Sequence, residues 1–254
     1  MMPATTRFRI GSVPYLNALP LTHTLGDQIE LLPPSALARE LHAGRLDAAL
    51  LSVTEVLGRP EYEVLDGVGI CSDGPVYSVF LAHRDPLDAV SEVYLDPASC
   101  TSVNLLRVLL AERGRLPACR PLAGYAEAAR HRNVLLIGNP AIEFRRSHPA
   151  HAIWDLGEAW RAMTGLPFVY AVWALRRGSP PELAVRLRAA QAAGLAALPE
   201  IVAGAPDFDA GFRRAYLGGH VQYRIGAREQ AGLHRFGELL VRHAGWGATH
   251  LRFV

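Results

Sequence analysis

The chain has 254 residues, of which 50% are hydrophobic and 20% are charged, and its formal net charge is +2. This composition excludes a disordered chain, and the nearly balanced charge argues against a dedicated nucleic-acid-binding protein, which would carry a concentrated basic face. All 26 basic residues are arginine, so the sequence contains no lysine. Mechanisms that require a lysine, such as Schiff-base formation or a Walker-type phosphate site, are therefore excluded.

Cysteine usage and hydropathy indicate the compartment. The three cysteines, Cys71, Cys100 and Cys119, have no C-x-x-C spacing and no even-numbered framework, which favours a reducing environment. Residues 1–9 carry no apolar segment of the kind found in a secretion signal. The apolar runs are interrupted by Gly, Pro or Arg well before the roughly 18 residues that a membrane span requires. We therefore expect a cytoplasmic protein with no membrane partner.

The N-terminal part alternates short apolar runs with one helical pattern. It predicts strands over residues 8–13, 29–32 and 47–53, and a helix that follows Ser35 and ends at Gly44. A strand, a helix and a strand at this spacing indicate a parallel crossover. The predicted fold class is therefore α/β.

The pattern continues through a middle region and ends in a helical tail. It predicts strands over residues 64–71, 76–83, 93–95, 134–137 and 167–175, and helices over residues 102–113, 125–132, 182–198 and 226–245.

Two segments, 84–86 and 176–181, have the Arg, Gly and Pro content of linkers. We expect two lobes, residues 1–85 plus 176–254 and residues 86–175, with a chain that crosses between them twice. A ligand of such a protein is expected in the cleft between the lobes.

Polar residues follow the first predicted strand at its carboxyl end. Tyr15 and Asn17 stand beside Pro14. One interpretation is a turn in which Asn17 caps a helix. The other is a cleft in which Asn17 hydrogen-bonds a small ligand. Composition alone favours the turn.

A second candidate site follows the strand predicted at residues 93–95. Ser99, Thr101 and Ser102 bring three hydroxyl groups to the predicted start of a helix. Free backbone N–H groups and the helix dipole at such a position can bind a carboxylate or a phosphate. Simple capping of the helix by the same hydroxyl groups is an equally good interpretation.

Two histidines lie close together in the sequence. His148 and His151 are three residues apart, but Pro149 stands between them. Because a proline there breaks a shared helix face, we expect no metal site.

Short motifs along the chain resemble those of one known family. They appear in order and cover nearly the whole sequence: YLNALPL (15–21), GRLDAAL (44–50), DGPVYS (73–78), SCTSV (99–103), LIGNPA (136–141), WDLGEAW (154–160), TGLPFVYAVW (164–173) and YRIG (223–226). On these motifs the chain resembles the MqnA family, the chorismate dehydratases of the futalosine route to menaquinone.

The resemblance implies a type II periplasmic-binding-protein-like fold put to enzymatic use, with two lobes, a central ligand cleft and a double crossover. It implies a hydro-lyase that removes water from chorismate, a small dicarboxylate, and gives 3-[(1-carboxyvinyl)oxy]benzoate. No cofactor is implied, because loss of the ring hydroxyl group and the neighbouring hydrogen makes the ring aromatic. The resemblance leaves the oligomeric state open.

The residue patterns and the resemblance together name the site residues. Asn17 and Ser78 are the expected catalytic residues, which hold the departing hydroxyl group or one carboxylate. The expected substrate-binding residues are Tyr15, Ser52, Ser99, Thr101, Ser102 and Asn139. We hypothesise that the substrate's own enolpyruvyl carboxylate is the base, because the matched motifs contain no obvious pair of a histidine and a carboxylate.

Two positions depart from the family pattern. Some members of the family carry Arg where Cys100 stands and Asp where Asn139 stands, so no direct ionic contact is expected from position 100. Two other functions stay open at this point. One is a non-catalytic module that binds a small carboxylate, and the other is the sister lyase that makes 1,4-dihydroxy-6-naphthoate.

Overall fold

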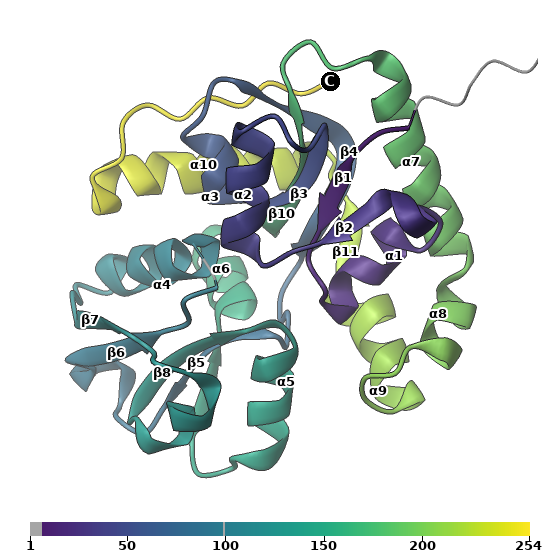
Figure 1. The fold of residues 1–254 in the computed structure, drawn as a ribbon. Helices are drawn as coiled ribbons and strands as arrows, with labels where there is room; N and C mark the ends of the chain where they lie inside the picture. The colour runs from purple at the N-terminus through teal and green to yellow at the C-terminus, as the bar shows by residue number, and fades with distance from the viewer. Residues whose placement is uncertain (1–6, 99) are drawn as a thin grey trace, which may run out of the picture.

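The computed structural model describes residues 7–98 and 100–254 and arranges them around two β-sheets (Figure 1). Within these residues the first sheet has six strands, in the order β11-β4-β10-β3-β1-β2. Their bounds are β1 (Ile10–Ser12), β2 (Ile29–Leu31), β3 (Ala48–Ser52), β4 (Tyr62–Ser72), β10 (Phe168–Arg176) and β11 (Gln222–Arg224). We call this sheet and the helices packed on it the first lobe.

The strands of the first sheet are partly parallel, as the N-terminal pattern predicts. Strand β1 pairs in parallel with both β2 and β3, and α2 (Pro34–His42) connects β2 to β3. Strand β10 is antiparallel to both β3 and β4. The sheet is therefore mixed, and its long strands β4 and β10 form an antiparallel pair.

The second sheet has five strands among the described residues, in the order β7-β6-β8-β5-β9. Its elements are β5 (Val79–His83), β6 (Glu92–Leu95), β7 (Ala118–Pro121), β8 (Asn133–Ile137) and β9 (Ala152–Asp155), with the helices α4 (Cys100–Glu112), α5 (Gly138–Ser147) and α6 (Leu156–Thr164). We call this part the second lobe, which is drawn mostly in teal in Figure 1.

Strand β8, inside the second sheet, is buried on both faces. Along β8, Leu135 and Ile137 join the main hydrophobic core, whereas Val134 and Leu136 join a smaller cluster with Phe144 of α5. Successive side chains of a strand point to opposite faces, so a continuous apolar run fills two cores at once. This explains why β8 has no polar alternation although it is a strand.

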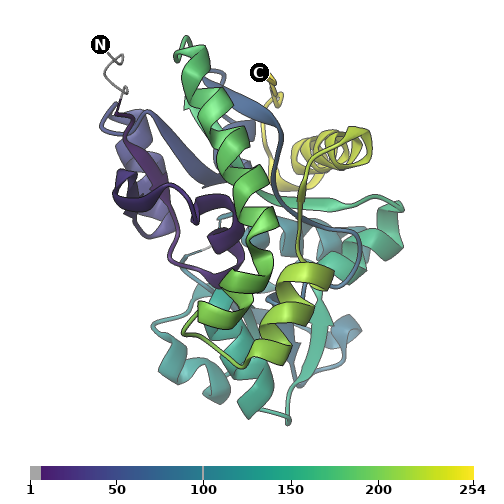
Figure 2. The ribbon, with the colours of Figure 1, turned by 90° about the vertical axis from the view of Figure 1, so that its right-hand side faces the viewer.

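Most of the other helices belong to the first lobe. They are α1 (Leu19–Thr22), α3 (Val53–Leu57), α7 (Pro181–Ala196), α8 (Leu198–Gly204), α9 (Ala210–Ala215) and α10 (Ala227–Ala244), and a π-helical turn (Tyr216–His220) follows α9. Figure 2 shows the long helix α7 running beside the N-terminal elements. Gly194 permits this packing, since a Cβ atom there would lie 2.0 Å from the carbonyl oxygen of Pro20 in α1.

The change of sheet occurs earlier in the chain than the linkers predicted from sequence. Strand β5 pairs with β8 and β9 in the second sheet, and β10 pairs with β3 and β4 in the first sheet. The chain therefore crosses at residues 73–78 and returns at residues 156–167, not at 84–86 and 176–181. Those two predicted linkers are turns within a lobe. An apolar strand can pair in either sheet, so its local pattern does not show which sheet it joins.

The C-terminal region is less uniformly helical than the sequence pattern suggests. The predicted helices at 182–198 and 226–245 correspond to α7 and α10. Between them, however, β11 adds a strand to the edge of the first sheet beside β4. This short strand is only three residues long and has no periodic signal of its own.

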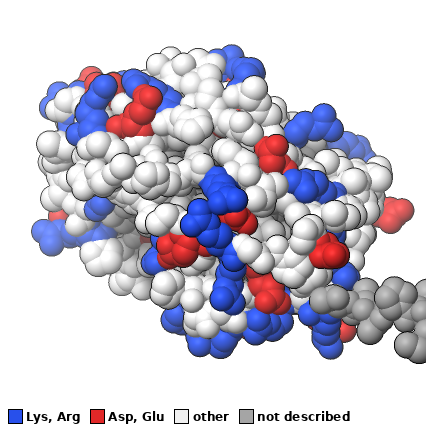
Figure 3. All heavy atoms as spheres, turned by 90° about the horizontal axis from the view of Figure 1, so that it is seen from above, with Lys and Arg blue, Asp and Glu red and all other residues white. Residues whose placement is uncertain are grey.

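The distribution of charged side chains on the surface agrees with the small net charge of the chain. On the face seen in Figure 3, arginine side chains and acidic side chains are interspersed, with uncharged surface between them. In the part of the chain that the structure describes, no helix has the length and apolar character needed to cross a membrane.

Candidate functional site

A cavity lies between the two lobes, where several strands end. Its empty space is about 670 Å³, counting the part that is open to solvent. The polar side chains that line it are Tyr15, Asn17, Ser52, Ser78, Thr101, Ser102 and Tyr170. Among the described residues, no Arg, His, Asp or Glu belongs to the lining. A ligand in this cavity therefore meets apolar side chains, neutral polar groups and backbone dipoles.

The topology explains why these residues meet. Ser52 ends β3, Ala98 follows β6, and Ile137 ends β8, so the lining includes the carboxyl ends of strands from both sheets. Helix α5 begins directly after β8, and α4 begins a short loop after β6, and both helices place their N-terminal ends at the cavity. Ligands in α/β proteins commonly bind at such strand ends and helix N-termini.

Six of the eight site residues named from the sequence line the cavity: Tyr15, Asn17, Ser52, Ser78, Thr101 and Ser102. Ser99 lies outside the described residues. Asn139 lies beside the cavity and is not part of its lining. Tyr170 lines the cavity although it was not named, because it sits in a continuous apolar strand that shows no sign of a site.

Ser78 and Asn17 both line the cavity and carry buried polar atoms. Ser78 is fully buried just before β5, and its Oγ accepts a hydrogen bond of 2.7 Å from the phenol of Tyr216. Asn17 has a buried Oδ1 with no hydrogen-bond partner among the described residues. Buried polar atoms are nearly always paired in native proteins, so a ligand that donates to Asn17 would satisfy this oxygen.

Three hydroxyl groups connect the helix starts on either side of the cavity. Thr101 Oγ1, at the start of α4, accepts a hydrogen bond of 3.1 Å from the backbone N–H of Thr54 and lies 3.0 Å from Thr54 Oγ1. Ser52 Oγ lies 3.4 Å from Thr54 Oγ1. Thr101 therefore joins the second lobe to α3 of the first lobe in addition to lining the cavity.

A buried carboxylate braces the loops around the cavity. Asp96 accepts hydrogen bonds from the backbone N–H groups of Ala98 (2.9 Å) and Ile137 (3.2 Å) and from the phenol of Tyr125 (3.1 Å). Burial raises the pKa of Asp96, although these three hydrogen bonds oppose the shift. Burial and the charge of Asp96 also raise the pKa of Tyr15. The Tyr15 phenol at the cavity is therefore neutral at physiological pH.

Asp155 ties the two crossing segments together. It ends β9, and its carboxylate accepts hydrogen bonds from the N–H groups of Val76 (3.1 Å) and Tyr77 (2.7 Å) in the first crossing. It also caps α6, because its Oδ1 accepts from the N–H groups of Gly157 and Glu158. One side chain thus holds the segment that enters the second lobe and the helix that leads back out.

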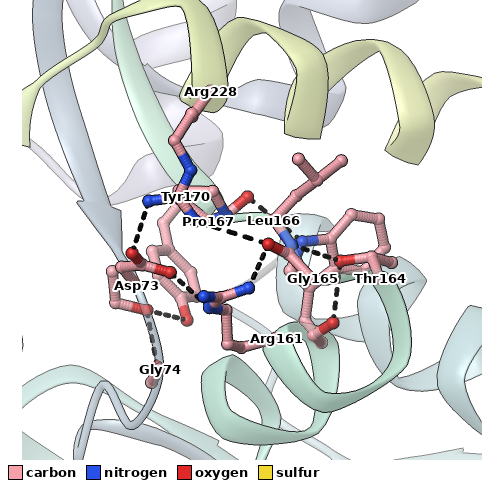
Figure 4. A network of polar contacts seen from close by, with 11 residues as sticks. Asp73, Gly74, Arg161, Thr164, Gly165, Leu166, Pro167, Tyr170 and Arg228 are labelled. Carbon is pink, nitrogen blue, oxygen red and sulfur yellow. Dashed lines mark hydrogen bonds and ion pairs between the residues drawn. The ribbon is translucent and has the colours of Figure 1, made fainter.

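Asp73 forms a second connection between the crossings (Figure 4). Its carboxylate pairs with Arg161 Nε of α6 at 2.6 Å and with Arg228 Nη1 of α10 at 2.8 Å. Figure 4 shows both guanidinium groups reaching from Asp73 toward the carbonyl oxygen of Gly165, to which both donate. Next to them, Ser72 Oγ donates to Gly74 O and lies 3.1 Å from the phenol oxygen of Tyr170.

Asn139 joins the lobes at the edge of the cavity. Its Oδ1 accepts a hydrogen bond of 3.3 Å from the N–H of Leu16, and its Nδ2 donates to Asp207 at 2.8 Å. About two turns further along α5, Arg146 pairs with Asp209 at 3.0 Å. Both polar atoms of Asn139 therefore contact protein groups of the first lobe. A direct contact between Asn139 and a substrate stays a prediction.

The described residues bring no three His, Cys, Asp or Glu side chains together in an arrangement that could hold a metal ion. His148 stacks on Phe144, and His151 lies 2.9 Å through Nε2 from the carbonyl oxygen of His131. These histidines therefore pack within the second lobe, away from the cavity lining.

Comparison with known families identifies related sequences. A family model described as "Menaquinone biosynthesis" matches residues 8–242. A chorismate dehydratase of Thermus thermophilus is 34% identical over 219 residues, which cover 76% of this chain and 79% of that protein. A chorismate dehydratase of Campylobacter jejuni is 30% identical over 172 residues, which cover 63% of this chain and 64% of that protein.

Solved structures share the fold at low sequence identity. A protein of Archaeoglobus fulgidus superimposes with a TM-score of 0.73 at 16% identity and covers 93% of this chain and 97% of its own. The alkanesulfonate-binding protein SsuA of Xanthomonas axonopodis pv. citri has a TM-score of 0.72 at 13% identity, with 96% of each chain covered. These similarities confirm the expected periplasmic-binding-protein-like fold. At such identities they concern the fold alone.

Proposed function

Because this chain belongs to the menaquinone-biosynthesis family, as its match over residues 8–242 shows, we propose that it is a chorismate dehydratase. The observation that carries the proposal is the 34% identity to the Thermus thermophilus enzyme over 76% of this chain. The cavity between the lobes supports it, because its mainly apolar wall with a few neutral polar groups suits a small molecule that has an apolar ring and polar substituents.

The proposed reaction is the loss of water from chorismate by a carbon–oxygen lyase. The bond between the ring carbon and its hydroxyl oxygen breaks, and the electron pair leaves with the oxygen. A proton leaves the neighbouring ring carbon, which is vinylogous to the ring carboxylate, so the negative charge that develops can spread into that group. The ring becomes aromatic and one water molecule is released, which leaves no need for an oxidant or a reductant.

In this proposal Asn17 and Ser78 hold the departing hydroxyl group. Asn17 Oδ1 accepts from the hydroxyl hydrogen, and the hydroxyl group of Ser78 donates to the departing oxygen. The start of α4, with Thr101 and Ser102, takes one carboxylate through backbone N–H groups and hydroxyl groups. Such groups act by orienting the substrate and by stabilising the charge that develops during the reaction.

The lining also bears on the identity of the base. It contains no Arg, His, Asp or Glu among the described residues, and the buried carboxylates beside it, Asp96 and Asp155, have their oxygens engaged by protein donors. We therefore propose that the enolpyruvyl carboxylate of chorismate removes the proton, while the protein orients it. A step in the pH dependence of kcat that disappears when one titratable side chain is replaced would contradict this assignment.

A direct assay tests the function. The purified protein is incubated with chorismate, and the aromatic product is followed by chromatography. Ser78→Ala and Asn17→Ala are expected to lower kcat about tenfold or more, because each removes a hydrogen bond to a group that gains charge. Ser147→Ala, on the exposed side of α5, is the matched control and should turn over chorismate at the wild-type rate.

A second outcome of the same assay favours a different function. The fold is shared with a solute-binding protein. The protein would then bind chorismate tightly and form no product. That result would indicate a binding module with the same fold. Formation of a product only from a later intermediate would indicate the sister lyase.

A further inference from the structure

Tyr216 lies behind Ser78 and makes no direct contribution to the cavity lining. It is buried, with 1% of its surface exposed, and begins the π-helical turn Tyr216–His220 in the first lobe. Its phenol donates a hydrogen bond of 2.7 Å to Ser78 Oγ, at the entrance to the second lobe. This side chain therefore reaches from one lobe to a cavity residue of the crossing segment.

The direction of this hydrogen bond determines what Ser78 can do. A serine hydroxyl group has one hydrogen to donate and two acceptor positions. Because Tyr216 donates to Ser78 Oγ, one acceptor position is occupied and the Ser78 hydrogen must point to another acceptor. Ser78 lines the cavity, where a ligand oxygen can provide that acceptor.

The environment of Tyr216 keeps its phenol a donor. Burial raises the pKa of Tyr216. The phenol therefore keeps its proton throughout the working pH range of an enzyme. It can fix the hydrogen-bond direction of Ser78, but it is a poor source of a proton for the departing hydroxyl group.

The π-helical turn holds this arrangement from two points. Tyr216 at its start contacts Ser78, and His220 at its end lies with Nδ1 at 3.0 Å from the carbonyl oxygen of Pro75. Both contacts fall on the crossing segment 73–78. π-Helical turns are rare in proteins and are frequent at functional sites.

We propose that Tyr216 is a positioning residue for the reaction, which directs the hydroxyl hydrogen of Ser78 toward the oxygen that departs from the substrate. This inference rests on the proposed dehydratase function. As the carbon–oxygen bond breaks, the departing oxygen gains negative charge and the hydrogen bond from Ser78 strengthens. No proton moves from Tyr216 or Ser78, because the proton that completes the water molecule is the one lost from the neighbouring ring carbon.

The test compares Tyr216→Phe with a matched control, Tyr223→Phe. Tyr223 is also buried, and its phenol has no hydrogen-bond partner among the described residues. Tyr216→Phe is expected to lower kcat about tenfold with KM changed less than about threefold, since it weakens a contact made mainly in the transition state. Tyr223→Phe should keep the wild-type kcat.

A double-mutant cycle separates positioning from a general structural role. In the Ser78→Ala background, Tyr216→Phe is expected to cause no further loss of kcat, because the group that it directs is absent. An equal loss in both backgrounds would overturn the inference, and so would a wild-type kcat in Tyr216→Phe. A wild-type protein that forms no product from chorismate would instead overturn the proposed function.

A second substitution covers the case in which Tyr216→Phe does not fold or Ser78→Ala has no measurable rate. Fluorotyrosines introduced at position 216 keep the shape of the side chain and make the phenol a progressively stronger donor. A stronger donor makes the Ser78 hydroxyl group a better donor in turn, so kcat is expected to rise along the series. The same kcat across the series would contradict the positioning role.

Discussion

The hydroxyl groups of Thr54 and Thr101 lie 3.0 Å apart and connect the starts of two helices from different lobes. Thr101 Oγ1 also accepts from the backbone N–H of Thr54, and both residues are buried. This contact lies beside the cavity, where Thr101 is part of the lining. The stability of the two-lobed arrangement and the shape of the cavity therefore depend on the same side chain.

Replacing Thr101 with Val should destabilise the protein. Valine has the same shape but leaves the buried N–H of Thr54 without its acceptor, so we expect the free energy of unfolding to fall by about 1–3 kcal/mol. Urea unfolding measures this change. Thr101→Ser keeps the hydroxyl group and is expected to lose less stability. Equal losses in the two variants would show that the hydrogen bond contributes nothing.

Replacing Asp207 with Ala should weaken the contact between the lobes. The change removes the acceptor of Asn139 Nδ2 but leaves the contact between Asn139 Oδ1 and Leu16. Because the pair is exposed, we expect only about a twofold to fivefold decrease in kcat/KM for chorismate. Asp88→Ala breaks a surface pair with Arg113 in the second lobe and provides the control. Indistinguishable kcat/KM values for the two variants would argue against a role of Asp207 in the contact between the lobes.

Replacing Gly157 with Ala should disturb the contact between the two crossing segments. A Cβ atom at this position would lie 2.5 Å from the carbonyl oxygen of Gly74 and 2.6 Å from the phenol oxygen of Tyr170. Because backbone must move to relieve this overlap, we expect a loss of about 1–3 kcal/mol in the free energy of unfolding. Gly204→Ala meets no atom within 4 Å and should unfold at the wild-type urea concentration.

His151 should make the second lobe sensitive to acid. Burial lowers its pKa from 6.5, the charges of Arg84, His148 and His83 add to this effect, and the hydrogen bond with His131 opposes it. Below pH 6.5 the unfolded chain therefore binds a proton at His151 that the folded chain does not yet bind. Above pH 6.5 this group does not affect the free energy of unfolding, which falls as the pH decreases from 6.5 towards the lowered pKa and changes no further below it.

The variant His151→Gln tests this dependence. Urea unfolding at about pH 7.5 and about pH 5 compares its loss of stability with that of the wild-type protein. The wild-type protein is expected to lose more stability on acidification than the variant, because glutamine does not titrate. Identical losses would show that His151 is not responsible.

Local patterns predicted much of the secondary structure and part of the site. Helices α7 and α10 and strands β3 and β8 lie close to their predicted ranges, because long helical periodicity and continuous apolar runs are local signals. Tyr15 and Asn17 were identified as candidates because they follow a strand that stops at a proline.

The partners of each strand could not be predicted in the same way. The sequence of strand β5 is compatible with a place in either sheet, because its apolar residues suit either core. Its hydrogen bonds to β8 and β9 join residues far apart in the sequence. The positions of the two crossings were therefore wrong in the sequence-based division, although the double crossover itself is present.

The sequence by itself determined the chemical character of the site. It contains no lysine and places neutral polar residues at the ends of its strands, so the polar groups that the cavity offers to a ligand are hydroxyl groups, an amide and backbone dipoles. Only the tertiary structure decided which of these groups have protein partners. Tyr216 reaches Ser78 across a separation of 138 residues, and Asn139 reaches Asp207 across 68. No local pattern encodes such contacts, because they depend on how the two lobes pack against each other.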